Sequence, residues 1–177
     1  ARSPAHRAKN RTAEESAELT RLAMELFGGL GFLEEYAVAR WHRESLITPI
    51  WEGPSNIQAL DLLEAMQKKG AHRPFLAWLE ARLKGRGEEA EGALAAARKT
   101  LDRLAALEPE AAQFSAKTAL RRLADAAAVA GLLEASATAG PRYRELAGLY
   151  ARRFLLGEDY PPEALGARAL YLPEGGA

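Results

Sequence analysis

Few residues of the types that most often carry chemistry stand at useful spacings in this sequence. The histidines, His6, His42 and His72, lie far apart, and none has a partner three or four residues away to make a helical metal pair. Cysteine is absent, which excludes disulfides, thiolate nucleophiles and cysteine-ligated metals. No Gly-x-Ser-x-Gly motif supports a hydrolase nucleophile. Spacing therefore predicts neither a metal site nor a nucleophile.

Two irregular segments interrupt an otherwise helical pattern. The glycine run at residues 28–31 lacks the spacing of a dinucleotide fingerprint and follows no strand, so by itself it indicates the end of a helix. The least helical stretch, residues 45–54, has Pro49, Gly53 and Pro54 around a Trp51-Glu52 pair. We expect an ordered turn or a loop there.

The elements that must position these segments are predicted from capping residues and apolar periodicity. Thr12 and Glu15 form a capping box that predicts a helix from there to about residue 27, and a short helix follows over about residues 34–44. A second capping box, Ser55 with Gln58, predicts a helix that ends near residue 70.

The second half of the chain predicts four more helices. Apolar residues recur at helical spacing over residues 75–83 and 94–104, a long helix runs from Pro109 to the Gly-Pro pair at residues 140–141, and a last one covers residues 143–154. Leu, Ala, Glu and Arg dominate the composition, and Val and Ile are scarce. The predicted fold class is therefore all-α, an antiparallel helical bundle.

Charge and hydropathy exclude several classes of partner. Lys plus Arg and Asp plus Glu both total 24, so no net field draws the chain to nucleic acid or to an anionic membrane. No stretch approaches the roughly 20 apolar residues of a membrane span, and no signal core follows the basic N-terminus. We expect a cytoplasmic protein.

Three short motifs follow one another between Glu25 and Leu63. They are Gly-Gly-x-Gly-aromatic at residues 28–32, Arg-x-x-Arg-acid at residues 40–44, and aromatic-Glu-Gly at residues 51–53, which leads into a helix. In this order and spacing the segment resembles the C-terminal signature of FAD-dependent acyl-CoA dehydrogenases. The matching residues are Gly28, Gly29, Gly31, Phe32, Arg40, Arg43, Glu44, Ile50, Trp51, Glu52, Gly53, Ile57 and Gln58.

The resemblance implies a role for each irregular segment. Glu52 takes the place of the base that removes the α-proton of an acyl-CoA thioester, and the alternative is a solvated carboxylate on a turn anchored by Trp51. In the family the glycine loop lies against the FAD of a neighbouring subunit. The residues assigned to the cofactor by resemblance are Gly28, Gly29, Gly31, Trp51 and Gly53. The glycines could equally be a plain helix stop, and Arg40 and Arg43 could be ordinary ion-pairing residues.

The sequence also departs from the family pattern. Glu25 stands where Gln is usual, and Pro54 stands where Thr is usual, so a negative charge is added and a hydroxyl is lost at positions that can contact the nucleotide. We therefore expect weak or absent FAD binding by the isolated chain. Trp51, Asn56 and the long extension resemble the DNA-alkylation-response branch, but basic and acidic residues nearly balance over residues 71–177, which makes DNA a minor alternative.

The sequence is interpreted as one helical domain over residues 1–177 with an irregular tail at 157–177. It would be a C-terminal fragment or a split part of a larger flavoenzyme, because no strand pattern supplies the family's β-domain. The implied activity is α,β-dehydrogenation of an acyl-CoA. The implied partners are a second copy of the chain or the missing N-terminal and β-domains. The competing hypothesis is a non-catalytic interaction or oligomerisation module.

Overall fold

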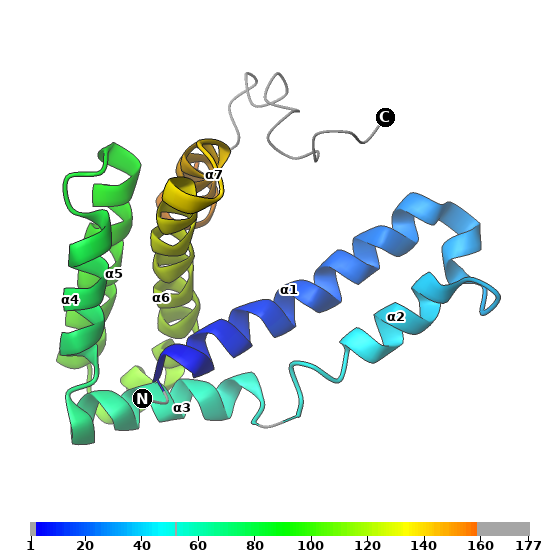
Figure 1. Ribbon diagram of the computed structural model, residues 1–177. Helices are drawn as coiled ribbons and strands as arrows, with labels where there is room; N and C mark the ends of the chain where they lie inside the picture. Colours follow the sequence, from blue (N-terminus) through cyan, green and yellow to red (C-terminus); the bar gives the residue numbers. More distant parts are fainter. Residues whose placement is uncertain (1–2, 52, 159–177) are drawn as a thin grey trace. The chain divides into compact units, whose positions relative to one another are not determined.

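The computed structural model describes residues 3–51 and 53–158 (Figure 1). Every regular element in these ranges is a helix, and no strand occurs in them, which confirms the all-α prediction. The chain divides into two compact units: unit 1 is Ala1–Lys69 with Pro109–Arg121, and unit 2 is Gly70–Glu108 with Arg122–Ala177. Each is described below by itself. The single domain over residues 1–177 stays a prediction.

Unit 1 is built around a helical hairpin. Helix α1 (Ser3–Phe27) passes through the 3-10 helix η1 (Gly28–Phe32) into α2 (Ala37–Ser45), and α1 and α2 pack side by side (Figure 1). Helix α3 (Ser55–Lys69) and the first part of α6 (Pro109–Thr138) complete the unit.

Two predicted helix starts in the hairpin are wrong. Helix α1 begins at Ser3, and Thr12 is an interior residue whose hydroxyl donates to the Lys9 carbonyl at 3.4 Å. Threonine commonly makes this backward hydrogen bond inside helices. The capping-box pattern of Thr12 and Glu15 therefore does not mark the start of α1. Helix α2 begins at Ala37 rather than near residue 34, because a turn with the bond from Tyr36 N to Leu33 O comes first.

The remaining elements match the predicted ones closely. Helix α3 starts at Ser55 and stops at Lys69, before Gly70 takes a left-handed φ of 58°. In unit 2, α4 (His72–Leu83), α5 (Glu88–Ala106), the second part of α6 and α7 (Arg142–Ala151) follow, and a short π-helix, η2 (Arg152–Leu156), ends the described helices. Residues 159–177 of the predicted tail lie outside the described residues.

The helices of unit 2 share an apolar core. Helix α4 packs on α5, and α5 packs on α7 and η2. Their facing side chains are leucine, alanine, phenylalanine and valine, as the helical periodicity predicted. The buried apolar residues of this unit are Phe75, Leu79, Leu83, Ala90, Ala93, Leu94, Ala97, Leu101, Leu104, Leu123, Ala124, Ala126, Val129, Ala130, Leu133, Ala147 and Ala151.

Candidate functional site

The glycine turn at the end of α1 contains three glycines with different reasons to be there. Gly28 has a φ of 59°, which side-chain-bearing residues rarely adopt. Gly31 is buried, and a Cβ built on it would lie 2.4 Å from the Met24 carbonyl oxygen, so any side chain would collide with backbone. Gly29 has neither constraint: a Cβ there would meet open space. The fold therefore explains Gly28 and Gly31 but leaves Gly29 unexplained.

The second predicted site is the turn before α3, and its backbone is tied down on both sides of residue 52. Lys9 of α1 donates from Nζ to the carbonyl of Trp51 at 2.9 Å and to that of Gly53 at 3.2 Å. The buried Gln58 donates from Nε2 to the same Gly53 carbonyl at 2.6 Å. Glu52, the predicted base, lies outside the described residues. The described residues thus show a turn whose flanks are held by α1 and α3.

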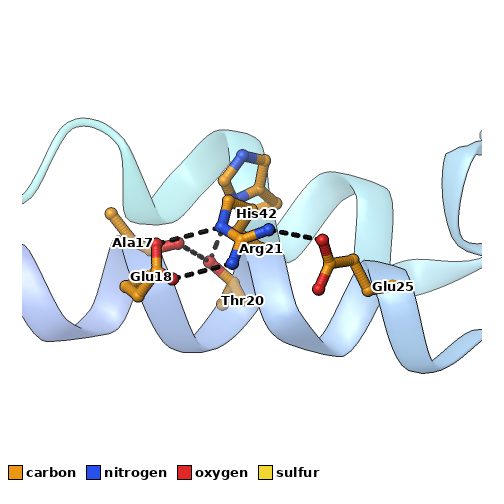
Figure 2. Close-up of polar contacts among 6 residues, drawn as sticks. All are labelled: Ala17, Glu18, Thr20, Arg21, Glu25 and His42. Carbon is orange, nitrogen blue, oxygen red and sulfur yellow. Dashed lines mark hydrogen bonds and ion pairs between the residues drawn. The ribbon is translucent and has the colours of Figure 1, made fainter.

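A row of hydroxyl groups joins α1 to α2 between these two turns. Thr20 Oγ1 lies 3.0 Å from His42 Nδ1 and 2.8 Å from Ser45 Oγ, and its contact with His42 is drawn in Figure 2. Nearer the start of the hairpin, Ser16 Oγ lies 3.0 Å from Thr48 Oγ1. We call Ser16, Thr20, His42, Ser45 and Thr48 the polar seam. Nδ1 of His42 therefore takes part in the contact between the two helices.

The acidic substitution at residue 25 is balanced by a neighbour on the same helix. Arg21 lies between Glu18 and Glu25, with N–O distances of 2.8 Å and 2.7 Å (Figure 2). The hydrogen bond from Arg21 lowers the pKa of Glu18 below its usual value, and the two carboxylates raise the pKa of Arg21. Glu25 thus shares one counter-charge with Glu18, and its negative charge is partly offset.

The two arginines of the middle motif lie on exposed parts of α2. Arg43 forms an ion pair with Glu34, as the structural interpretation of that motif expected. Arg40 makes no hydrogen bond or ion pair with another residue of the part of the chain that the structure describes. Of the two arginines, only Arg43 forms an ion pair within the hairpin as described.

The structure does not bring the glycine turn and the Glu52 turn together within one chain. The flanks of residue 52 are held by Lys9, whereas the glycine turn begins after Phe27, at the other end of the same helix (Figure 1). Eighteen residues of α-helix rise about 27 Å. A molecule that contacts both turns must therefore be as long as the hairpin, or the two turns of one chain contribute to different sites.

The described residues contain neither a metal-binding cluster nor a membrane-spanning helix. No group of three or more His, Asp or Glu side chains in this part of the chain is arranged to hold a metal ion. Over the same residues, no helix combines the length and the apolarity that crossing a bilayer requires.

Comparison with known proteins decides which family the hairpin resembles. The family described as "Acyl-CoA dehydrogenase, C-terminal domain" matches residues 1–67, which include both turns and the polar seam. Residues 1–67 match the acyl-CoA dehydrogenase C-terminal domain. The family resemblance inferred from the three motifs is thereby confirmed, and the match ends inside α3.

Individual relatives agree with this match. The chain is 36% identical over 85 residues to 3-methylmercaptopropionyl-CoA dehydrogenase of Ruegeria pomeroyi, which covers 48% of this chain and 14% of that protein. It is 43% identical over 56 residues to a short-chain specific acyl-CoA dehydrogenase of Clostridium acetobutylicum, covering 32% of this chain and 15% of that protein. Acryloyl-CoA reductase (NADH) of Anaerotignum propionicum is 31% identical over 61 residues, 34% of this chain and 16% of that protein.

These alignments thus span about one seventh of each relative's length. They do not distinguish the branches of the family, so the resemblance to the DNA-alkylation-response branch stays a prediction.

Sequence reasoning missed two features of the site. Lys9 is 42 residues from Trp51, and a single lysine in a helix carries no local signal of a contact so distant. The polar seam was also missed, because Ser, Thr and His scattered along two helices are common on surfaces. A signal was present on α1, where Ser16 and Thr20 are four residues apart and therefore lie on one helix face.

Proposed function

We propose that this chain supplies the C-terminal helical domain of an FAD-dependent acyl-CoA dehydrogenase, which forms a double bond between the α and β carbons of an acyl-CoA thioester. The observation that carries the proposal is the match of residues 1–67 to that domain. It is supported by relatives whose names describe oxidation or reduction of acyl-CoA thioesters.

In this proposal Glu52 removes the α-proton. A carboxylate is a useful base for a carbon acid only when it is aimed at the proton and poorly hydrated. The tethers from Lys9 and Gln58 to the Trp51 and Gly53 carbonyls support such an aim, because they fix the backbone on both sides of Glu52. FAD, when bound, supplies the acceptor for the β-hydride.

The residues of this chain that would hold FAD are Gly28, Gly29, Gly31, Trp51 and Gly53. The open space above Gly28 and Gly29 fits this role, since backbone amides without side chains can be approached closely by phosphate oxygens. Arg21 reduces the repulsion that Glu25 would exert on a phosphate. Because the two turns lie about 27 Å apart along α1, the glycine turn would serve the site of a second copy.

Self-association belongs to the same proposal. Large apolar side chains on α1, η1 and α2 are exposed, among them Leu26 at 88% and Phe32 at 79%. Apolar surface of this extent marks a face that meets another protein surface. We assign this face to contact with a second copy of the chain or with the missing domains. The proposal places the protein in the cytoplasm.

The decisive test is Glu52→Gln in a complete enzyme reconstituted from this chain and the missing domains. The substitution keeps size and hydrogen-bonding capacity, so acyl-CoA should still bind, while flavin reduction should fall by about a hundredfold or more. Glu35→Gln, a change of the same chemistry in the exposed turn before α2, is the control. Flavin reduction at the parental rate in Glu52→Gln would place the base elsewhere and leave residues 49–54 a structural turn.

The exposed apolar side chains also favour a second candidate, an interaction module without catalysis. The two candidates separate on one measurement. A reconstituted complex that forms, binds FAD and reduces no flavin with any acyl-CoA would favour the module. Sedimentation of the chain as a strict monomer at micromolar concentration would remove the self-association that both share.

A further inference from the structure

A small cavity opens on unit 2, outside the residues that match the dehydrogenase domain. Its volume is about 130 Å³, and side chains from α5, α6 and α7 line it. The floor is apolar and almost fully buried, and consists of Ala90, Val129, Leu133 and Ala147. A single water molecule needs only about 10–15 Å³ of such space, so the cavity has room for a short hydrocarbon chain.

The rim of this cavity carries positive charge that the rest of the described chain does not neutralise. Arg86, in the loop before α5, and Arg144, in the first turn of α7, both line it. Neither guanidinium makes a hydrogen bond or an ion pair with any other residue of ranges 3–51 and 53–158. Two exposed arginines from different elements therefore face one opening without a protein partner.

The carboxylate at the rim does not cancel this charge. Glu89 accepts from Arg152 Nε at 3.1 Å and from its terminal nitrogen at 2.6 Å. Those hydrogen bonds lower the pKa of Glu89, so the pair is fully formed at neutral pH and has no net charge. Arg86 and Arg144 remain as the charged groups that line the cavity and form no hydrogen bond or ion pair with the described residues.

We infer that this cavity binds a small carboxylate with a short hydrocarbon tail. Guanidinium groups match a carboxylate through paired hydrogen bonds, and the apolar floor below them would remove the tail from water. An inorganic anion has no hydrocarbon part to bury against the floor, and a neutral alcohol would leave the arginines unpaired. The site needs both parts of the ligand, and it does not depend on the proposed dehydrogenase function.

The probe is butyrate, titrated into the 177-residue chain and followed by the amide resonances of the residues that line the cavity. We expect saturable binding near millimolar, the ordinary range for so small a ligand, with the Gly148 amide among the shifted resonances. Inorganic phosphate and 1-butanol, titrated in the same way, should each bind at least tenfold more weakly.

Four variants test the two parts of the site. Arg86→Gln and Arg144→Gln should each weaken butyrate binding about fivefold or more, whereas Arg103→Gln, which removes a charge from the exposed end of α5, should not. Gly148→Ala places a methyl group in the cavity at an ordinary 3.8 Å from the Glu89 carboxyl carbon, and it should abolish binding without disturbing the fold. Gly131→Ala, where nothing lies within 4 Å, gives the same gain in helix propensity and should leave binding unchanged.

Several results would overturn the inference. The site does not exist if butyrate fails to saturate below about 100 mM, or if the bound state survives Gly148→Ala with unchanged affinity. Equal affinity for phosphate and butyrate would show that the floor takes no part in binding. Unaltered affinity in both arginine variants would show that the rim takes none.

Discussion

Helices α1 and α2 of unit 1 meet through hydroxyl groups and a histidine, whereas α4, α5 and α7 of unit 2 meet through leucine and alanine side chains. In the hairpin, Val38 and Ala13 are the buried apolar residues of α1 and α2 within the part described. In unit 2, Leu79, Leu83 and Leu123 are fully buried. The helix contacts are therefore mainly polar in the hairpin and mainly apolar in unit 2.

The difference follows from where each unit puts its apolar side chains. Burial of apolar surface is the dominant stabilising term, at about 25 cal/mol per Å². Unit 2 gains this stabilisation from contacts among its own helices. The hairpin directs most of its large apolar residues outward and keeps polar contacts between its helices, which contribute about 1 kcal/mol each. The exposed apolar residues of the hairpin would be buried by the second protein surface that belongs to the proposed function.

The largest expected contrast lies between two leucines. Leu79→Ala in α4 removes a side chain with no exposed surface and should lower the free energy of unfolding by about 2–5 kcal/mol. Leu26→Ala in α1, where the side chain is 88% exposed, should change it by less than about 0.5 kcal/mol in the isolated chain. Urea denaturation followed by circular dichroism measures both. Equal losses would mean that the hairpin buries Leu26 in solution.

The polar seam should respond to the loss of one hydroxyl. Thr20→Val keeps the shape of the side chain but removes the contacts with His42 and Ser45, so the free energy of unfolding should fall by about 1–2 kcal/mol. Hydrogen exchange of the α1 and α2 amides should accelerate in parallel. Thr118→Val, at an exposed position of α6, is the matched control. A seam variant as stable as this control would show that the seam contributes nothing.

A smaller effect is expected at the turn that carries Glu52. Lys9→Met keeps the length of the side chain but leaves the Trp51 and Gly53 carbonyls without its ammonium group. Stability should fall by less than about 1 kcal/mol, while the Trp51 amide should exchange faster and its indole fluorescence should change. Lys99→Met on α5 controls for the loss of a charge. Unchanged Trp51 exchange would mean that Gln58 alone holds the turn.

The smallest expected effect is the pH dependence of one ion pair in unit 2. Arg152 lowers the pKa of Glu89, so the pair stabilises the folded state above the unfolded pKa of a glutamate, about 4.3, and this contribution is lost as the pH falls through the lower folded value. Glu89→Gln should therefore be slightly less stable than the parent at pH 7 and equal to it near pH 2. Denaturation midpoints at both pH values measure this. A difference that persists at pH 2 would have another origin.

Most of the secondary structure could be predicted because its signals are local. The starts of α3 and α6, at Ser55 and Pro109, and the end of α1 at Phe27 follow from the proline and glycine breakers at or beside them. The start of α1 could not, because Thr12 lies inside the helix: its hydroxyl donates back to the Lys9 carbonyl, whereas the hydroxyl of a cap would accept from a backbone N–H further along the chain. The family of residues 1–67 was also predictable, since it depends on order and spacing.

The contacts that position the candidate site were decided by tertiary structure. Lys9 reaches the Trp51 and Gly53 carbonyls because α1 runs past the turn before α3, and nothing near Lys9 in sequence encodes that approach. Tertiary structure also decides that Arg86 and Arg144 line one cavity, and that the two turns lie far apart along α1. Sequence by itself determined which segments are helical and which family they resemble, because periodicity and motif spacing are properties of neighbours. Which distant side chains meet depends on how helices pack, and that is a property of the folded chain alone.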